Sequence, residues 1–297
     1  MLIALLVPIV LATLTFAAVL LKSAIAKQAK PTWESIGLGA VVSFFDTLGI
    51  GCFAPSTAWF KFRKLVPDRL IPPTLVVGLT ITAVVESIIF LLKLGVKVDP
   101  VLLAGCIIAC TAGGWIGASL VHRTRVWVVQ MVVAVGLLLA AIAYGMTNLH
   151  MFPGGGMASS LPIALTVIAI TANFGIGVLL NYGVGNYAPT LVMLSLMGMD
   201  PRLCFPVMAG AAALMGATAG IRHINTGHID LRVVLGLTIG GIPAVLVAAY
   251  IVVTMPLEIL RWLVLLVVLY AAAIMFQAAI VGRREHHAEA GTAALAD

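Results

Sequence analysis

Two short phrases rich in Gly and Pro interrupt long apolar segments, and their residue types suit the binding of an anion. The first phrase runs from Gly49 to Ser56, and it returns in the second half of the chain from Gly183 to Thr190. Proline favours the first position of a helix, so Pro55 and Pro189 predict that a helix restarts in each phrase. Helix N-termini present unpaired N–H groups and a partial positive charge, which together bind anions.

The two phrases also predict which residues contact a ligand. Glycines let the backbone approach a ligand closely, and hydroxyl or amide side chains add hydrogen bonds. We expect the substrate site to comprise Gly49, Gly51, Cys52, Phe53, Ala54, Pro55, Ser56, Thr57, Gly183, Gly185, Asn186, Tyr187, Ala188, Pro189 and Thr190. Two such N-termini facing each other would hold a small oxyanion without Lys or Arg and release it readily. The alternative is that Gly and Pro only let the helices kink and pack.

The composition indicates that both phrases lie inside a membrane protein. Apolar residues make up 62% of the chain and charged residues 9%, whereas soluble domains are about half apolar and about a quarter charged. Lys and Arg fall in the short gaps between apolar runs, as in cytoplasmic membrane loops, so the net charge of +6 does not require nucleic acid. Paired helix breaks at matching places in two halves are typical of a transporter's binding site.

The positions of the basic residues predict the path of the chain through the membrane. Basic residues flank both ends of the apolar run 36–60, so both ends favour the cytoplasm and the run should form a re-entrant hairpin. Run 160–198 should form a second hairpin, entered from outside. The other runs are expected to cross the membrane once each: 2–21, 71–92, 100–121, 126–147, 203–221, 231–254 and 259–281.

The sequence therefore predicts an all-α polytopic membrane protein with an inverted-topology repeat. Each half would be a broken, re-entrant helix hairpin plus three transmembrane helices. The N-terminus would be external and the C-terminus cytoplasmic; the alternative counts each hairpin as a full crossing, or a crossing plus a stub. The expected boundaries are an extra N-terminal helix (1–30), a first repeat (31–148), an external linker (149–159), a second repeat (160–282) and a disordered cytoplasmic tail (283–297).

Further matches between the halves support the duplication. Asp99 and Asp230 each precede an apolar run and suit the N-cap of a helix. The pairs Gly113-Gly114 and Gly240-Gly241 then fall at similar depths in those helices, where small residues permit close packing.

Two acidic residues lie at membrane depth. Asp46 comes just before the first break, and Glu86 lies inside the run 71–92. Ionisable residues inside a membrane are energetically unfavourable and usually functional, so these two acids are candidates for binding protons that couple transport. The alternatives are a structural role as protonated, hydrogen-bonded carboxyl groups or, for Asp46, an ion pair with a basic residue. Neither acid has an acidic counterpart in the other half.

The segments Leu48–Gly51, Gly183–Pro189 and Arg222–Asp230 resemble the TauE/SafE family of sulfite exporters and related anion permeases. The resemblance covers most of the chain from about Gly37, and it implies a duplicated protein of the bacterial inner membrane that moves sulfite or small organosulfur anions. Many members have a fuller glycine run where this chain has Cys52-Phe53 and Asn186-Tyr187. Because of this difference, the resemblance predicts the fold more firmly than it predicts the substrate.

We expect a secondary transporter of small, sulfur-containing anions. An enzyme is not expected, because no G-x-S-x-G or H-E-x-x-H motif is present. No cofactor or metal is expected, because the four cysteines lie in apolar stretches without tight C-x-x-C spacing. The expected partners are a small anion and the lipid bilayer, with a coupling proton and a homodimer left open. The alternative functions are a cation or metal-ion permease that uses the intramembrane acids, and a non-transporting assembly subunit.

Overall fold

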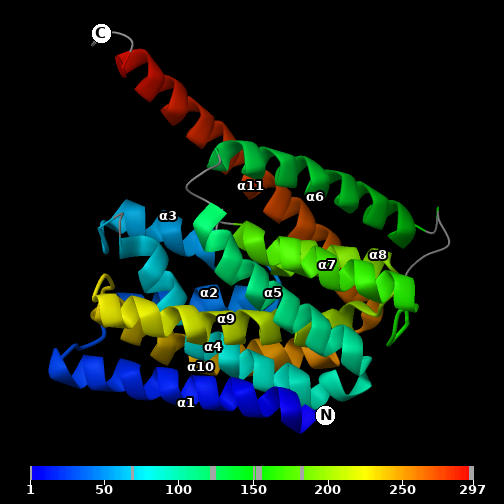
Figure 1. Ribbon diagram of the computed structural model, residues 1–297, viewed down its shortest axis with the longest axis horizontal. Helices are drawn as coiled ribbons and strands as arrows, with labels where there is room; N and C mark the ends of the chain where they lie inside the picture. Colours follow the sequence, from blue (N-terminus) through cyan, green and yellow to red (C-terminus); the bar gives the residue numbers. More distant parts are fainter. Residues whose placement is uncertain are drawn as a thin grey trace.

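The computed structural model describes residues 2–67, 70–120, 125–149, 151, 156–180 and 184–293. Their regular structure is helical, with a single isolated β-bridge (Figure 1). The helices are α1 (Leu2–Ala26), α2 (Trp33–Thr47), α3 (Phe53–Arg63), α4 (Ile71–Lys93), α5 (Pro100–Leu120), α6 (Val126–Asn148), α7 (Ile163–Leu180), α8 (Tyr187–Leu196), α9 (Phe205–Thr226), α10 (Leu231–Thr254) and α11 (Leu257–Ala293), with short 3₁₀ turns η2 (Gly95–Lys97) and η4 (Pro201–Cys204).

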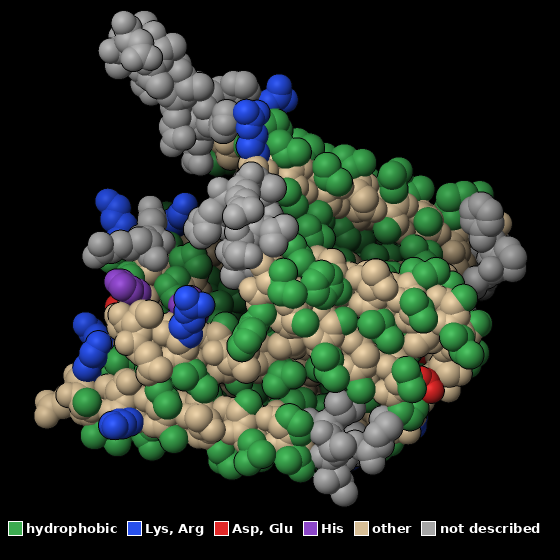
Figure 2. Space-filling model, in the orientation of Figure 1, with side chains coloured by type: hydrophobic (Ala, Val, Ile, Leu, Met, Phe, Trp, Pro, Cys, Tyr) green, Lys and Arg blue, Asp and Glu red, His purple; other side chains and the backbone are tan. Residues whose placement is uncertain are grey.

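Eight of the described helices are long and apolar enough to cross a membrane, namely α1, α4, α5, α6, α7, α9, α10 and α11. Large apolar side chains are exposed along them (Figure 2). Leu139, for example, is 62% exposed and Ile163 is 86% exposed. Apolar surface of this extent needs a lipid environment. The predicted all-α polytopic class is confirmed.

The first broken segment folds back on itself. The Glu34 carboxylate, near the start of α2, accepts hydrogen bonds from Arg63 Nε at 2.8 Å and Trp59 Nε1 at 3.2 Å, both near the end of α3. The hydrogen bond from Arg63 holds the pKa of Glu34 below its usual value. Because the beginning of α2 and the end of α3 meet, the chain returns to the side from which it entered, as a hairpin requires.

The two ends of the second broken segment also meet, and here backbone hydrogen bonds join them. The Ala158 N–H, just before α7, donates to the Gly198 carbonyl at 3.2 Å, and the Asp200 N–H donates to the Ala158 carbonyl at 3.0 Å. The chain therefore enters α7 and leaves α8 at the same place. The long arm α7 has 18 residues, or about 27 Å of helix, so it also counts among the eight helices of membrane-crossing length.

The long arm of each hairpin packs against a helix of the other half. Helix α2 lies along α10 and α7 lies along α5, while α4 packs on α9 and α6 on α11 (Figure 1). In the predicted repeats, α2 corresponds to α7 and α5 corresponds to α10, so the two crossed contacts are counterparts. This arrangement brings both hairpins into one bundle; the inverted orientation of the repeats stays a prediction.

Glycines allow both crossed contacts to be close. A Cβ on Gly113 of α5 would overlap the carbonyl of Phe174 on α7, and one on Gly240 of α10 would overlap the carbonyl of Ile36 on α2. Close backbone approach of this kind is how small residues stabilise helix packing in membranes. The close packing predicted for these glycines is therefore present.

The N-cap predictions are confirmed, and the prediction for the chain end is wrong in part. Asp99 Oδ1 accepts from the Leu102 N–H at 2.9 Å, and Asp230 Oδ1 accepts from the Arg232 and Val233 N–H groups. Helix α11 continues to Ala293, although a disordered tail was expected from residue 283. No Pro follows position 282 and Ala, Glu and Arg are frequent there, so good helix formers extend the transmembrane helix.

Candidate functional site

The first break is built around two glycines with left-handed backbone angles. Helix α2 ends at Thr47, and Gly49 and Gly51 follow with φ of 95° and 89°. The Gly49 N–H donates to the Asp46 carbonyl at 2.7 Å, and the Ile50 N–H donates to the Phe45 carbonyl at 3.0 Å. Side chains with a Cβ rarely adopt such angles, so glycine lets the chain reverse here within a few residues.

The second break lies between the end of α7 at Leu180 and the start of α8 at Tyr187. Gly183, a predicted site residue, is outside the described residues. Gly185 is described, and its φ is not in the left-handed region. The two glycine phrases, which are alike in sequence, therefore differ in local backbone geometry.

Both return helices begin two residues earlier than their prolines predict. Helix α3 begins at Phe53 after the N-cap Cys52, and α8 begins at Tyr187 after the N-cap Asn186. Pro55 and Pro189 thus occupy the third helical position instead of the first. This position is also tolerated, because the first four N–H groups of a helix lack an intrahelical partner.

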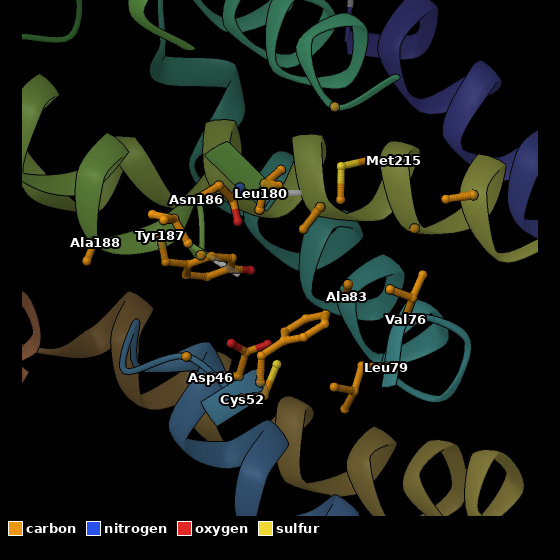
Figure 3. A pocket seen from close by; sticks show the side chains of 18 of the residues that line it. Asp46, Cys52, Val76, Leu79, Ala83, Leu180, Asn186, Tyr187, Ala188 and Met215 are labelled. Atoms are coloured by element: carbon orange, nitrogen blue, oxygen red, sulfur yellow. The ribbon is translucent and has the colours of Figure 1, made fainter. Parts of the chain in front are cut away.

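Both breaks open on one cavity of about 900 Å³. Helices α4, α5, α9 and α11 supply further walls of this cavity, which are mostly apolar. Figure 3 shows Asp46 and Cys52 on one side and Asn186 and Tyr187 on the other. Segments far apart in the sequence therefore present two helix N-termini to a common space.

Most of the predicted site residues line this cavity, and some do not. Those that line it are Asp46, Gly49, Gly51, Cys52, Phe53, Gly185, Asn186, Tyr187, Ala188 and Pro189. The side chain of Ala54, in the first turn of α3, is outside the described part of the structure. The cavity lining does not include Pro55, Ser56, Thr57, Glu86 or Thr190. Ser56 is fully buried within the protein, and the Thr190 hydroxyl donates to Asn173 Oδ1 at 3.2 Å. The hydrogen bonds to a ligand that were expected from these two hydroxyls are not available in this arrangement.

Internal hydrogen bonds tie the second break to neighbouring helices. The Asn186 amide donates to the Met208 carbonyl of α9 at 3.0 Å, which leaves its oxygen as an acceptor. The Tyr187 hydroxyl donates to Glu86 Oε1 of α4 at 2.7 Å. These bonds attach the start of α8 to α9 and α4. They therefore fix the position of the N–H groups in its first turn.

Several polar residues around the site were not predicted from the sequence. Arg222 and His223, at the end of α9, line the cavity together with Thr226, although the sequence alone marks them only as a basic cluster. Asn173 is 1% exposed inside α7 and accepts from Thr190. A polar residue within an apolar run at membrane depth is the signal that could have identified Asn173.

The fold and the cavity define a polytopic α-helical membrane protein with paired helix breaks around a central cavity. Residues 155–296 match the family model described as Sulfite exporter TauE/SafE. The match covers the second hairpin and the three helices after it, and it confirms the resemblance to this family over that part of the chain. Neither the curated proteins nor the solved structures gave a significant match to the chain.

Proposed function

We propose that the protein is a secondary transporter of small anions, with sulfite and small organosulfonates as the expected class. The observation that supports this most is that two helix N-termini, at Phe53 and Tyr187, border one cavity. N-terminal N–H groups and helix dipoles attract an anion without a fixed positive charge in the site. The description of the matching family names sulfite export, and the same chemistry suits any small oxyanion.

A basic vestibule would lead anions to this site. Arg222 and His223 line the cavity at the end of α9, and Figure 2 shows Lys, Arg and His side chains at the end of the molecule where α9 ends. A cleft lined by one sign of charge raises the local concentration of its counter-ion. By the positive-inside rule this end would be cytoplasmic, in a bacterial inner membrane, with the N-terminus external. Transport would follow when the hairpins move and open the cavity to the other side.

The proposal is tested by flux into proteoliposomes that contain the purified protein. The challenge set is sulfite, thiosulfate, sulfonates, carboxylates and divalent metals. Flux of a sulfur oxyanion that requires the protein supports the proposal. A response to metals together with silence to every anion would overturn it and favour a cation permease.

The variant Asn186→Asp discriminates between an anion transporter and a cation permease, because it places a negative charge at the second break. Anion flux should be lost, whereas cation flux would persist or rise. Gln28→Glu adds the same charge at an exposed position outside the cavity, and it should leave anion flux unchanged. Both variants are first compared with the wild type by size-exclusion chromatography to establish correct folding.

A further inference from the structure

Glu86 joins the two breaks through its carboxyl group. The side chain lies in the middle of α4 and is 1% exposed. Its Oε1 accepts from the Tyr187 hydroxyl at 2.7 Å, and its Oε2 lies 3.3 Å from the hydroxyl of Thr47. Tyr187 begins α8 and Thr47 ends α2. One carboxyl group therefore contacts a residue beside each of the two helix breaks.

Glu86 has no cationic partner within the described part of the chain. The ion pair found there joins Arg63 to Glu34, at the surface. The ionisable groups that approach Glu86 are Asp46 and Cys52 from the first break, and Tyr187. The other elements packed on α4 have their titratable side chains near their ends: Lys22 on α1, Lys61 and Arg63 on α3, Lys97 on η2, Arg222 and His223 on α9, and Arg232 and Tyr250 on α10.

The hydrogen bonds around Glu86 are satisfied best when its carboxyl has a proton. The Thr47 hydroxyl donates to the Ser43 carbonyl at 2.9 Å and also lies against Glu86 Oε2. A hydroxyl has one proton to donate, and its oxygen can accept a second hydrogen bond. A protonated Glu86 can donate to Thr47 while its other oxygen accepts from Tyr187. An ionised carboxylate, buried beside a second acid and without a cation, would be strongly unfavourable.

We propose that Glu86 holds a proton, and that this proton is required for an anion to bind in the cavity. The inference rests on the proposed anion transport and adds its coupling ion. Tyr187, the first residue of α8, lines the cavity while its hydroxyl contacts Glu86, so a single side chain separates the carboxyl from the N-terminus of α8. An ionised Glu86 would cancel the positive potential of that N-terminus and repel the anion. Proton and anion therefore raise each other's affinity, and they move together.

Binding of ethanesulfonate to the purified protein in lipid nanodiscs tests this coupling, because the charge of a sulfonate does not change over the range studied. The wild-type affinity should fall at least about tenfold from mildly acidic to alkaline pH. Glu86→Gln is neutral at every pH and retains groups for both hydrogen bonds, so its affinity should stay high throughout. Glu34→Gln, the control at an exposed acid, should follow the wild type. A Glu86→Gln variant with the pH dependence of the wild type would overturn the proposal.

Two further measurements use the wild type, and the first of them needs no variant. Ethanesulfonate binding in weakly buffered solution above neutral pH should take up about one proton per anion; binding without uptake contradicts the coupling. Infrared spectra should contain the carbonyl band of a protonated carboxylic acid, which Glu86→Gln should lose. If that band is present and no anion binds at any pH, the proton on Glu86 stands and the anion transport of the preceding section fails. If the band is missing while anions bind, transport stands and the inference about Glu86 fails.

Discussion

Replacement of Gly51 by alanine should destabilise the first break, whereas the same replacement at Gly185 should not destabilise the second. The two glycines occupy the same position in their phrases, so sequence alone would assign them equal effects. The structure separates them, because Gly51 has a φ of 89° and Gly185 lies outside the left-handed region. Neither substitution causes a steric clash, since nothing lies within 4 Å of an added Cβ at either position.

The expected magnitudes follow from backbone energetics alone. A residue with a Cβ in a left-handed conformation costs roughly 1–2 kcal/mol, so Gly51→Ala should lower the free energy of unfolding by that amount. An alanine that fits the native backbone restricts the unfolded chain and stabilises by about 0.4–1 kcal/mol, so Gly185→Ala should be neutral to slightly stabilising. The two variants should therefore differ by about 1.5–3 kcal/mol.

The difference can be measured by unfolding the purified protein in mixed detergent micelles and following helix content by circular dichroism. Gly136→Ala, in α6 and with nothing within 4 Å of its Cβ, calibrates a helix-interior replacement, for which we expect a gain of roughly 0.5–1 kcal/mol. Equal losses for Gly51→Ala and Gly185→Ala, or a larger loss for Gly185→Ala, would refute the reasoning from backbone angles.

Three further predictions concern the helices that hold the site. Gly240→Ala forces a Cβ against the Ile36 backbone and should cost about 1–3 kcal/mol in the same unfolding assay; no loss would mean that α2 and α10 are less close than described. Asp230→Ala removes the N-cap of α10 and should cost about 0.5–2 kcal/mol, with an unchanged unfolding midpoint as the contrary result. The pKa of Glu34 is lowered by Arg63, so the contribution of this pair is present above the ordinary pKa of Glu and is lost as pH falls through the lower, folded-state value. The small difference in unfolding midpoint between wild type and Glu34→Gln should therefore be seen near neutral pH and disappear as pH falls below the lowered pKa of Glu34; a difference that grows in acid would contradict this sign.

Local properties of the sequence were sufficient to identify the class of protein and the position of the breaks. Apolar runs of membrane length, basic residues at their ends and repeated Gly and Pro phrases each depend on residues close together in the chain. Because Asp99 and Asp230 cap helices through neighbouring backbone groups, their roles could also be predicted. Each broken segment folds back on itself, while the path through the membrane that charge placement indicates stays a prediction.

The tertiary structure determined which of those residues face the cavity. Each return helix begins two residues before its proline, and each residue of an α-helix turns the side-chain direction by about 100°. A small shift in the start therefore redirects whole side chains, and Ser56 and Thr190 are buried away from the cavity instead of lining it. The contacts of Tyr187 with Glu86 and of Asn186 with Met208 join segments that are distant in the sequence. Such contacts depend on how α4, α8 and α9 pack together, and no local pattern of residues encodes that packing.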